Sequence, residues 1–213
     1  LPAALVDEGK AFAEREGSTF FITLVSAYAS VLHRYSHQTD FGIGAILMNR
    51  DRWPDVSGFV ANTVVLRCDF RGMPTFLDVV SRMHHVVAEA IEHQDVPYEE
   101  IVKASHRRRT GGARDPLVQA SIELGSGLVS AGLDVASTRW RPVVLSADGA
   151  VDDGVAKFDL GLSMVELDGE LLCKIEFHPA EYELQAIERF AGHLTRLLGS
   201  AIRSPDLFVA DLP

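Results

Sequence analysis

The chain has 213 residues, of which 47% are hydrophobic and 23% charged, so it can bury one core as a single domain or a large lobe of one. Its 30 acidic and 20 basic residues give a formal net charge of -10, which repels phosphate backbones and argues against nucleic acid as a partner. No apolar run approaches the roughly 20 residues that cross a bilayer, and the first residues lack the basic start and the apolar segment of a signal peptide. We therefore expect no membrane association and a cytoplasmic location.

Two further features concern the origin of the chain and its redox state. The chain begins with Leu1 rather than Met, so we expect it to be a piece of a longer protein. Cys68 and Cys173 are isolated in apolar, strand-like sequence. This placement predicts two buried, reduced thiols rather than a disulfide or a redox pair.

In the first half of the chain, the spacing of apolar residues predicts two long helices and two strands. The first helix starts at Ser18 or Thr19 as N-cap and continues to Tyr35. Residues 42–48 and 62–70 are typical of buried strands, and the polar loop 49–57 between them should be exposed. Pro74 and Thr75 then open a second amphipathic helix, which stops near His93.

In the second half, Pro97 opens a short helix as far as Lys103, and residues 117–124 are predicted to form a strand. Residues 125–155 are rich in Gly, Ser, Ala and Asp, with an extended segment at 140–145, and form a long functional or mobile excursion. The segments 157–167 and 170–177 flank Asp168-Gly169 and predict a hairpin, and a helix follows at 181–202. Strands with long covering helices predict an α/β fold, a two-layer α/β sandwich.

His84 and His85 lie side by side on the second predicted helix. Adjacent helical residues point about 100° apart, so the two imidazoles cannot bind one metal ion or one substrate atom. We interpret them as surface or boundary residues, and the sequence predicts no metal site.

Three short segments in fixed order carry the functional signal: 57–67 (SGFVANTVVLR), 93–99 (HQDVPYE) and 114–117 (RDPL). None of them places a nucleophile beside a base, spaces metal ligands or forms a phosphate loop. Any chemistry must therefore be shared with residues elsewhere.

The polar residues of these segments allow structural and functional interpretations. Asn62, Thr63 and Arg67 lie on an apolar strand, where polar groups must find partners, so they either anchor a neighbouring loop or line a channel. His93 and Asp95 could act as base and orienting acid. The favoured interpretation is that Asp95 caps the next helix while Gln94 satisfies backbone groups. For Arg114 and Asp115, a local ion pair is favoured over catalysis.

The three segments together resemble the second half of a condensation domain of nonribosomal peptide synthetases. Residues 58–67 are similar to the family block GxFVNTxxxR, residues 93–99 to HQDxPFE, and residues 114–117 to the end of RDxSRNPL. The resemblance extends to residues 19–38, 74–76 and 156–160 and to the final helix, so it covers nearly the whole chain.

The resemblance implies that residues 1–213 are the C-terminal subdomain of a condensation domain, a single chloramphenicol acetyltransferase-like lobe that faces a second lobe across a tunnel. In that family an acceptor amine attacks a thioester carried by another carrier protein, and an amide forms. The block HHxxxDG, which supplies the working histidine, belongs to the other lobe. Glu89 and Ala90 follow His84-His85 where Asp and Gly would stand, so the isolated fragment is expected to be inactive and to hold no catalytic residue.

The resemblance also implies the site and its partners. The expected partners are the N-terminal lobe, donor and acceptor peptidyl carrier proteins and an adjacent adenylation domain. No cofactor is expected, because phosphopantetheine enters as the tether of the substrates. By analogy residues 49–62 form the floor loop of the tunnel, and residues 125–155 hold a latch that crosses to the other lobe. The residues expected in the tunnel wall are Asn62, Arg67, Gln94, Asp95, Arg114 and Asp115.

The chain also departs from the family blocks. Val60-Ala61 replaces Phe-Val, Tyr98 replaces Phe, and Asp115 replaces Asn, which changes the charge beside the tunnel. Three alternatives share the fold. An epimerisation domain is disfavoured because PxxGxGYG is missing and residues 121–124 (SIEL) stand where FNYLG is expected. Heterocyclisation is disfavoured by the intact HQD. The third alternative is a non-catalytic recruitment or docking module.

Overall fold

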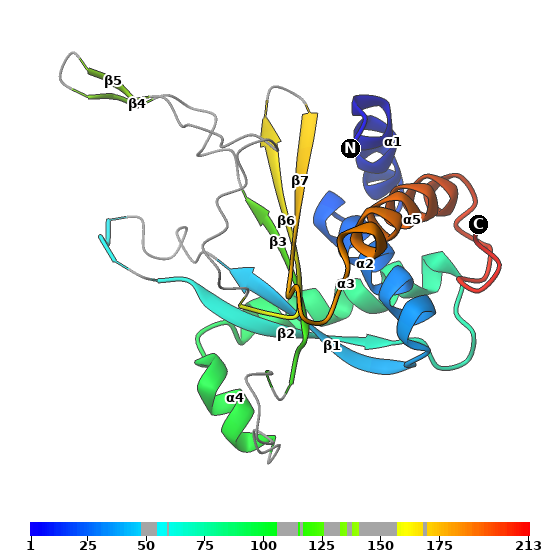
Figure 1. The fold of residues 1–213 in the computed structure, drawn as a ribbon, viewed down its shortest axis with the longest axis horizontal. Helices are drawn as coiled ribbons and strands as arrows, with labels where there is room; N and C mark the ends of the chain where they lie inside the picture. Colours follow the sequence, from blue (N-terminus) through cyan, green and yellow to red (C-terminus); the bar gives the residue numbers. More distant parts are fainter. Residues whose placement is uncertain are drawn as a thin grey trace.

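The fold is known from a computed structural model, drawn in Figure 1. It describes residues 1–47, 55–58, 60–105, 115, 117–125, 133–135, 138–140, 157–167 and 170–213. The helices and strands, in chain order, are α1 (Ala3–Arg15), α2 (Phe20–Ser36), β1 (Asp40–Leu47), β2 (Asn62–Asp69), α3 (Phe76–Glu92), α4 (Tyr98–Ala104), β3 (Ala120–Gly125), β4 (Leu133–Val135), β5 (Thr138–Trp140), β6 (Leu160–Leu167), β7 (Glu170–Phe177) and α5 (Leu184–Arg203).

Five strands form one mixed sheet in the order β2-β1-β3-β6-β7. The central neighbours β1 and β3, and β3 and β6, run parallel, whereas the edge strands β2 and β7 run antiparallel to their neighbours. The predicted hairpin is confirmed by the pairing of β6 with β7, in which Leu167 faces Glu170, and its turn at 168–169 lies outside the described residues.

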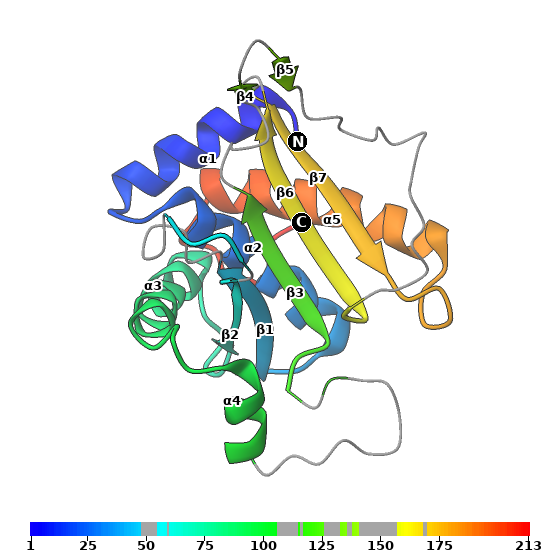
Figure 2. The same cartoon turned by 90° about the vertical axis from the view of Figure 1, so that its left-hand side faces the viewer.

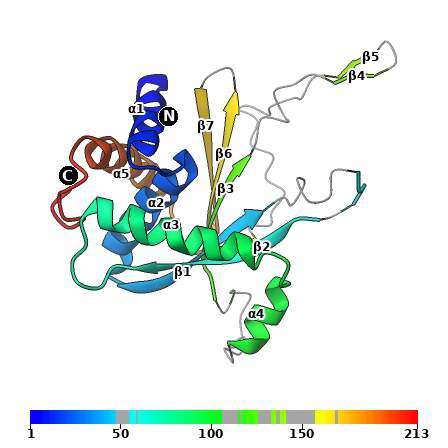
Figure 3. The same cartoon turned by 180° about the vertical axis from the view of Figure 1, so that it is seen from behind.

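The helices α1, α2, α3 and α5 lie together on one side of this sheet (Figure 1). Figure 2 looks onto the opposite side, where β3, β6 and β7 lie in front of the helices; we call this side the open face. The predicted two-layer α/β sandwich is therefore confirmed. Helix α4 lies apart from the helical layer, beyond the C-terminal end of α3 (Figure 3).

Helix α2 is central to the buried core. Val25, Tyr28 and Ala29 on this helix have no exposed surface, and the Tyr28 hydroxyl donates to the carbonyl of Leu160 on β6 at 3.4 Å. Thr19 is the N-cap, since its Oγ1 accepts from the backbone N–H of Ile22 at 3.2 Å. The predicted cap of this helix is confirmed.

Helix α1 is not among the elements predicted above. Leu5, Val6, Phe12 and Ala13 recur at helical spacing and are buried, but Pro2 precedes the helix and no side chain caps it. The usual start signal is therefore missing from the sequence. Strands β3 and β6 and helix α5 each begin three residues later than predicted. Of the expected extended segment 140–145, the structure describes only Trp140, the last residue of β5.

Both cysteines are free, but their environments differ. Cys68 is buried as predicted, whereas Cys173 is exposed, so the prediction of a second buried thiol is wrong. Cys173 lies on β7, an edge strand with a neighbouring strand on one side only, which leaves its side chains less covered. His84 and His85 are exposed on α3, as expected for surface residues. No helix in the described ranges is long and apolar enough to cross a membrane.

Two glycines of β1 allow other segments to cross the open face closely. A Cβ on Gly42 would lie 3.2 Å from Cγ1 of Val118, and one on Gly44 would lie 3.2 Å from Cγ2 of Val118 and 3.6 Å from Cζ of Phe158. Val118 is fully buried as a result. The residues that lead into β3 and β6 are thus packed directly over β1, and this crossing forms one side of the pocket described below.

Thr75 and Asp78 at the start of α3 form a reciprocal capping box, which generates the first prediction. Thr75 Oγ1 accepts from the Asp78 N–H at 3.1 Å, and Asp78 Oδ2 accepts from the Thr75 N–H at 2.9 Å. We expect Thr75→Ala to lower the free energy of unfolding in urea by about 1 kcal/mol, whereas Thr75→Ser keeps the hydroxyl and most of the stability. An equal loss in both variants would contradict the capping role.

The same box predicts a pH dependence. Hydrogen bonds from the backbone and side chain of Thr75 hold the pKa of Asp78 below its usual value. A carboxyl with a lowered pKa in the folded state stabilises the fold above its unfolded pKa, and this contribution is lost as the pH falls through the folded pKa. The difference between wild type and Thr75→Ala should therefore shrink below about pH 4. A difference that stays constant with pH would exclude a contribution from Asp78.

Candidate functional site

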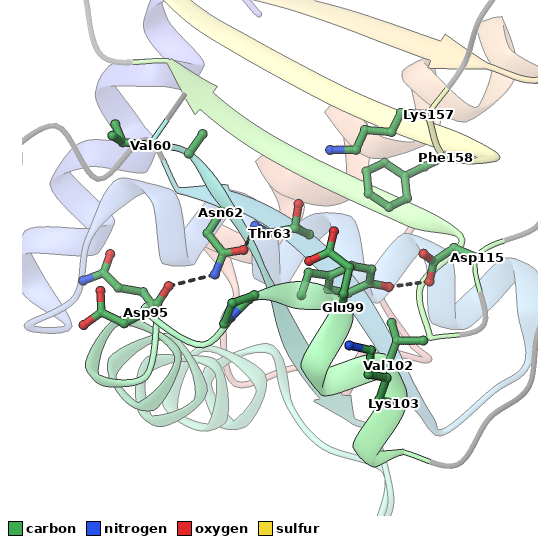
Figure 4. A pocket seen from close by; sticks show the side chains of 14 residues that line it. Val60, Asn62, Thr63, Asp95, Glu99, Val102, Lys103, Asp115, Lys157 and Phe158 are labelled. Carbon is green, nitrogen blue, oxygen red and sulfur yellow. Dashed lines mark hydrogen bonds between the residues drawn. The ribbon is translucent and has the colours of Figure 1, made fainter. Parts of the chain in front are cut away.

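A pocket of about 740 Å³ lies between the N-terminal end of β2, helix α4 and the residues that precede β3 and β6 (Figure 4). Its lining combines apolar walls with amide, carboxylate and ammonium groups. The lining residues are Val60, Ala61, Asn62, Thr63, Gln94, Asp95, Pro97, Tyr98, Glu99, Val102, Lys103, Asp115, Lys157 and Phe158.

The pocket brings together all three segments that the sequence analysis singled out. Residues 60–63 come from the first segment, Asp115 comes from the third, and the second segment provides Gln94, Asp95, Pro97, Tyr98 and Glu99. The fold joins these separate segments because α3 returns the chain to the start of β2 while β3 pairs beside β1.

Asn62 connects the first segment to the second. Its Nδ2 donates to the backbone carbonyls of Gln94 at 2.8 Å and Val96 at 2.7 Å, and its Oδ1 accepts from the N–H of Thr63 at 2.9 Å. The side chain therefore fixes the backbone between α3 and α4 while it also lines the pocket. Of the two interpretations that the sequence left open, the loop anchor describes Asn62, and the lining of a channel stays a prediction.

Asp115 connects the third segment to the second. Its Oδ1 accepts hydrogen bonds from the backbone N–H groups of Leu117 at 2.9 Å and Val118 at 3.0 Å, and also from the hydroxyl of Tyr98 (Figure 4). Burial, followed by the hydrogen bond to Asp115, raises the pKa of Tyr98 well above its usual value, so Tyr98 stays protonated as a donor.

Charges of both signs surround the pocket. Three carboxylates, those of Asp95, Glu99 and Asp115, share the lining with the ammonium groups of Lys103 and Lys157. Lys103 forms an ion pair with Glu100 at 2.6 Å, and the Nζ of Lys157 lies 5.6 Å from the centre of the Phe158 ring. The described lining residues include no histidine, cysteine or serine. This arrangement suits the binding and orientation of a mixed polar and apolar group better than nucleophilic catalysis.

Four of the six residues expected in the tunnel wall line the pocket. Asn62, Gln94, Asp95 and Asp115 line the pocket, and Arg114 lies outside the described residues. Asp95 is not the capping residue of α4, because the N-cap of that helix is Pro97, with no side-chain cap.

Arg67 does not line the pocket. It lies near the other end of β2, where its Nε and Nη2 donate to the two carboxylate oxygens of Asp40 at 2.8 Å and 2.6 Å. This hydrogen-bonded pairing is the main cause that holds the pKa of Asp40 below its usual value. Arg67 thus ties β2 to the start of β1, five residues along the strand from Asn62.

Several lining residues were missed by sequence reasoning, notably Tyr98, Lys103, Lys157 and Phe158. Lys157 and Phe158 precede β6, which only the parallel pairing of β3 with β6 brings beside Asp115. A signal was present in the sequence, since residues 156–160 and Tyr98 belong to the stretches that resemble family segments.

Comparisons with known proteins agree with this resemblance. The family model described as Condensation domain matches residues 1–213. Chondramide synthase of Chondromyces crocatus is 35% identical over 203 residues, which cover 94% of this chain and 5% of that protein. A phosphinothricin tripeptide synthetase of Streptomyces viridochromogenes is 30% identical over 215 residues, which cover 100% of this chain and 19% of that protein. The chain therefore spans a small fraction of the length of these relatives.

Solved structures match the fold. The condensation domain of a monacolin K polyketide synthase superposes with a TM-score of 0.77 at 20% identity, covering 98% of this chain and 47% of that chain. The X-domain from teicoplanin biosynthesis superposes with a TM-score of 0.81 at 23% identity, covering 100% of this chain and 48% of that chain. The same X-domain in complex with OxyB superposes with a TM-score of 0.78 at 24% identity, covering 100% of this chain and 46% of that chain. This chain spans about half of each, and the expected acetyltransferase-like lobe is confirmed.

The anchoring role of Asn62 can be tested by substitution. Asn62→Ala removes two donated hydrogen bonds, so the free energy of unfolding should fall by about 2 kcal/mol and amide hydrogen exchange at residues 94–96 and at Tyr98 should accelerate. Asn62→Asp should lower the free energy of unfolding further, because a carboxylate would face the two carbonyl oxygens. Unchanged exchange of these amides in both variants would show that Asn62 does not hold this loop.

The Arg67–Asp40 pair predicts a different effect. Because Asp40 has a lowered pKa when folded, it stabilises the protein above its unfolded pKa, and that stabilisation disappears as acid protonates it. In Arg67→Gln, the free energy of unfolding should differ less between about pH 7 and about pH 3 than in wild type. Asp40→Asn should reduce the difference similarly, and the double variant should add nothing further. Additive effects would contradict a pairwise interaction.

Proposed function

The chain belongs to the condensation domain family, and from that premise we propose that it is the C-terminal lobe of an amide-forming acyltransferase of nonribosomal peptide synthesis. The pocket beside β2 and α4 would be one wall of the tunnel in which two carrier-tethered aminoacyl or peptidyl thioesters react. The observation that carries this proposal is the convergence of three family-like segments, far apart in sequence, on one pocket.

In the proposed reaction the acceptor amine attacks the thioester carbonyl, a C–N bond forms, the C–S bond breaks, and the thiolate leaves and takes up the proton lost by the amine. The thioester is already activated, so the largest contribution of this lobe is to hold the reactants together. Asn62, Gln94, Asp95 and Asp115 would form the wall, in which the side-chain oxygens of Gln94 and Asp95 can accept hydrogen bonds from an amine, whereas Asp115 holds the wall in place. The proton-transferring histidine would come from the other lobe.

The proposed partners follow from the share of related proteins that this chain spans. It matches about half of the solved domains, which supports pairing with an N-terminal lobe, and the side of the sheet that we assign to this pairing is the open face. Donor and acceptor peptidyl carrier proteins and an adenylation domain would complete the synthetase, with phosphopantetheine as a substrate tether and no other cofactor. Residues 125–155 would supply the latch between lobes, and the protein would act in the cytoplasm.

A second candidate is a recruitment module without catalysis. The X-domain, which this chain resembles in fold, has been captured in a complex with OxyB, so the same architecture supports docking in that protein. The sequence upstream of Leu1 separates the two candidates. An intact HHxxxDG favours amide formation, and a degraded block favours docking; an epimerisation domain would in addition require motifs that differ from residues 121–124.

The direct test is an amide-formation assay. The two-lobe protein that contains this chain, supplied with an aminoacyl donor and an aminoacyl acceptor on their carrier proteins, should yield the dipeptidyl thioester, detected by mass spectrometry of the acceptor carrier. The 213-residue chain alone, shown to be folded by circular dichroism, should yield none. Turnover by the chain alone comparable to the two-lobe protein would overturn the claim that the other lobe supplies the base.

A further inference from the structure

Two departures from the family blocks meet in space. Tyr98 stands where the block HQDxPFE has Phe, and Asp115 stands where RDxSRNPL has Asn, and the hydroxyl of Tyr98 donates directly to the carboxylate of Asp115 (Figure 4). The two residues are 17 positions apart and lie on different segments. The hydroxyl and the charge that distinguish this chain from the family pattern are therefore partners in one hydrogen bond.

Asp115 is the rigid half of this contact. Its Oδ1 also accepts from the N–H groups of Leu117 and Val118, which fixes the turn that leads into β3, and its backbone carbonyl accepts from the side chain of Gln119 at 2.9 Å. Val118 is fully buried against the two glycines of β1. The carboxylate is thus attached to the core of the fold.

Tyr98 is the first residue of α4, which is the weakly held half. Helix α4 has no buried residue, and its N-cap Pro97 provides no side-chain hydrogen bond. Glu99, Val102 and Lys103 of this helix nevertheless form one side of the pocket. Asn62 holds the backbone just before the helix. Among the residues that the structure describes, the hydrogen bond from the Tyr98 hydroxyl to Asp115 ties α4 itself to the segment before β3, across the pocket.

We propose that Tyr98 and Asp115 are a matched positioning pair that sets the distance between α4 and the turn before β3, and so sets the width of the substrate pocket in this protein. The pair acts by holding a wall in place rather than by touching the reacting atoms. Its role in substrate binding rests on the proposed function, whereas the pairing itself does not.

The chemistry predicts that the two positions must change together. Tyr98→Phe alone removes the donor and leaves a partly buried carboxylate facing an aromatic ring, which is unfavourable and should push α4 away. Asp115→Asn alone leaves the hydroxyl with a neutral acceptor, a weaker bond. The double variant restores the Phe and Asn of the family blocks, in which the amide oxygen still accepts from Leu117 and Val118 and the ring packs without an unpaired hydroxyl.

The test is a double-mutant cycle in the two-lobe protein, with amide formation measured against the concentration of the acceptor carrier. Tyr98→Phe should raise KM by about tenfold with little change in kcat, Asp115→Asn should raise it less, and the double variant should return to within about twofold of wild type. The melting temperature should change little in all three, because α4 buries no residue. Tyr35→Phe is the matched control, since it removes a hydroxyl bonded to His193 outside this pocket.

Amide hydrogen exchange tests the pair without reference to catalysis. The amides of α4 should exchange faster in Tyr98→Phe than in wild type, because the hydroxyl that holds the helix to Asp115 is gone, and they should return toward the wild-type rate in the double variant. Unchanged exchange of these amides in Tyr98→Phe would disprove the pairing. Additive effects of the two substitutions on KM, or a fall in kcat together with a fall in the melting temperature, would disprove the positioning role. If the wild-type protein forms no amide, the proposed function fails, and hydrogen exchange alone decides whether the pair exists.

Discussion

The pocket depends on the close crossing of two segments over β1. Val118 and Phe158 pack where Gly42 and Gly44 have no side chains, and a Cβ at either glycine would meet Val118 at 3.2 Å. This contact brings the turn at Asp115 and the residues before β6 onto the open face of the sheet. Without it, the third family segment would lie away from the first two.

The walls of the pocket differ in how firmly they are held. The start of β2 and the turn before β3 are continuous with the buried core through Thr63 and Val118. Helix α4 is attached by side-chain hydrogen bonds from Asn62 and Tyr98 to neighbouring segments. The position of α4 therefore depends on these few hydrogen bonds rather than on buried side chains of its own.

This construction agrees with an active site shared between two lobes. The described lining residues provide amide, carboxylate and ammonium groups that can bind and orient a substrate, and they include no histidine. In the proposed function this lobe would contribute shape and polar contacts, and a second lobe would contribute proton transfer. The described helices α1, α2, α3 and α5 cover one side of the sheet, so the open face is the side that would meet the second lobe (Figure 2).

Local sequence patterns predicted the helix starts and the hairpin, because these features depend on residues close together in the chain. The cap at Thr19, the start of a helix at Pro74 and Thr75 and the β6–β7 hairpin depend on residues a few positions apart, so their signals lie in short stretches of sequence. The exposure of Cys173 was not predictable in this way, because it depends on the position of β7 at the edge of the sheet.

The sequence by itself determined the α/β class, most of the helices and strands, and the three segments that carry the family resemblance. The tertiary structure alone decided which of their residues meet. Asn62 and Arg67 lie on one strand, yet one enters the pocket and the other pairs with Asp40, while Lys157 reaches the pocket from a distant segment. The physical reason is that strand order and the packing of Val118 over glycine join residues far apart in the chain, and no local periodicity records those pairings.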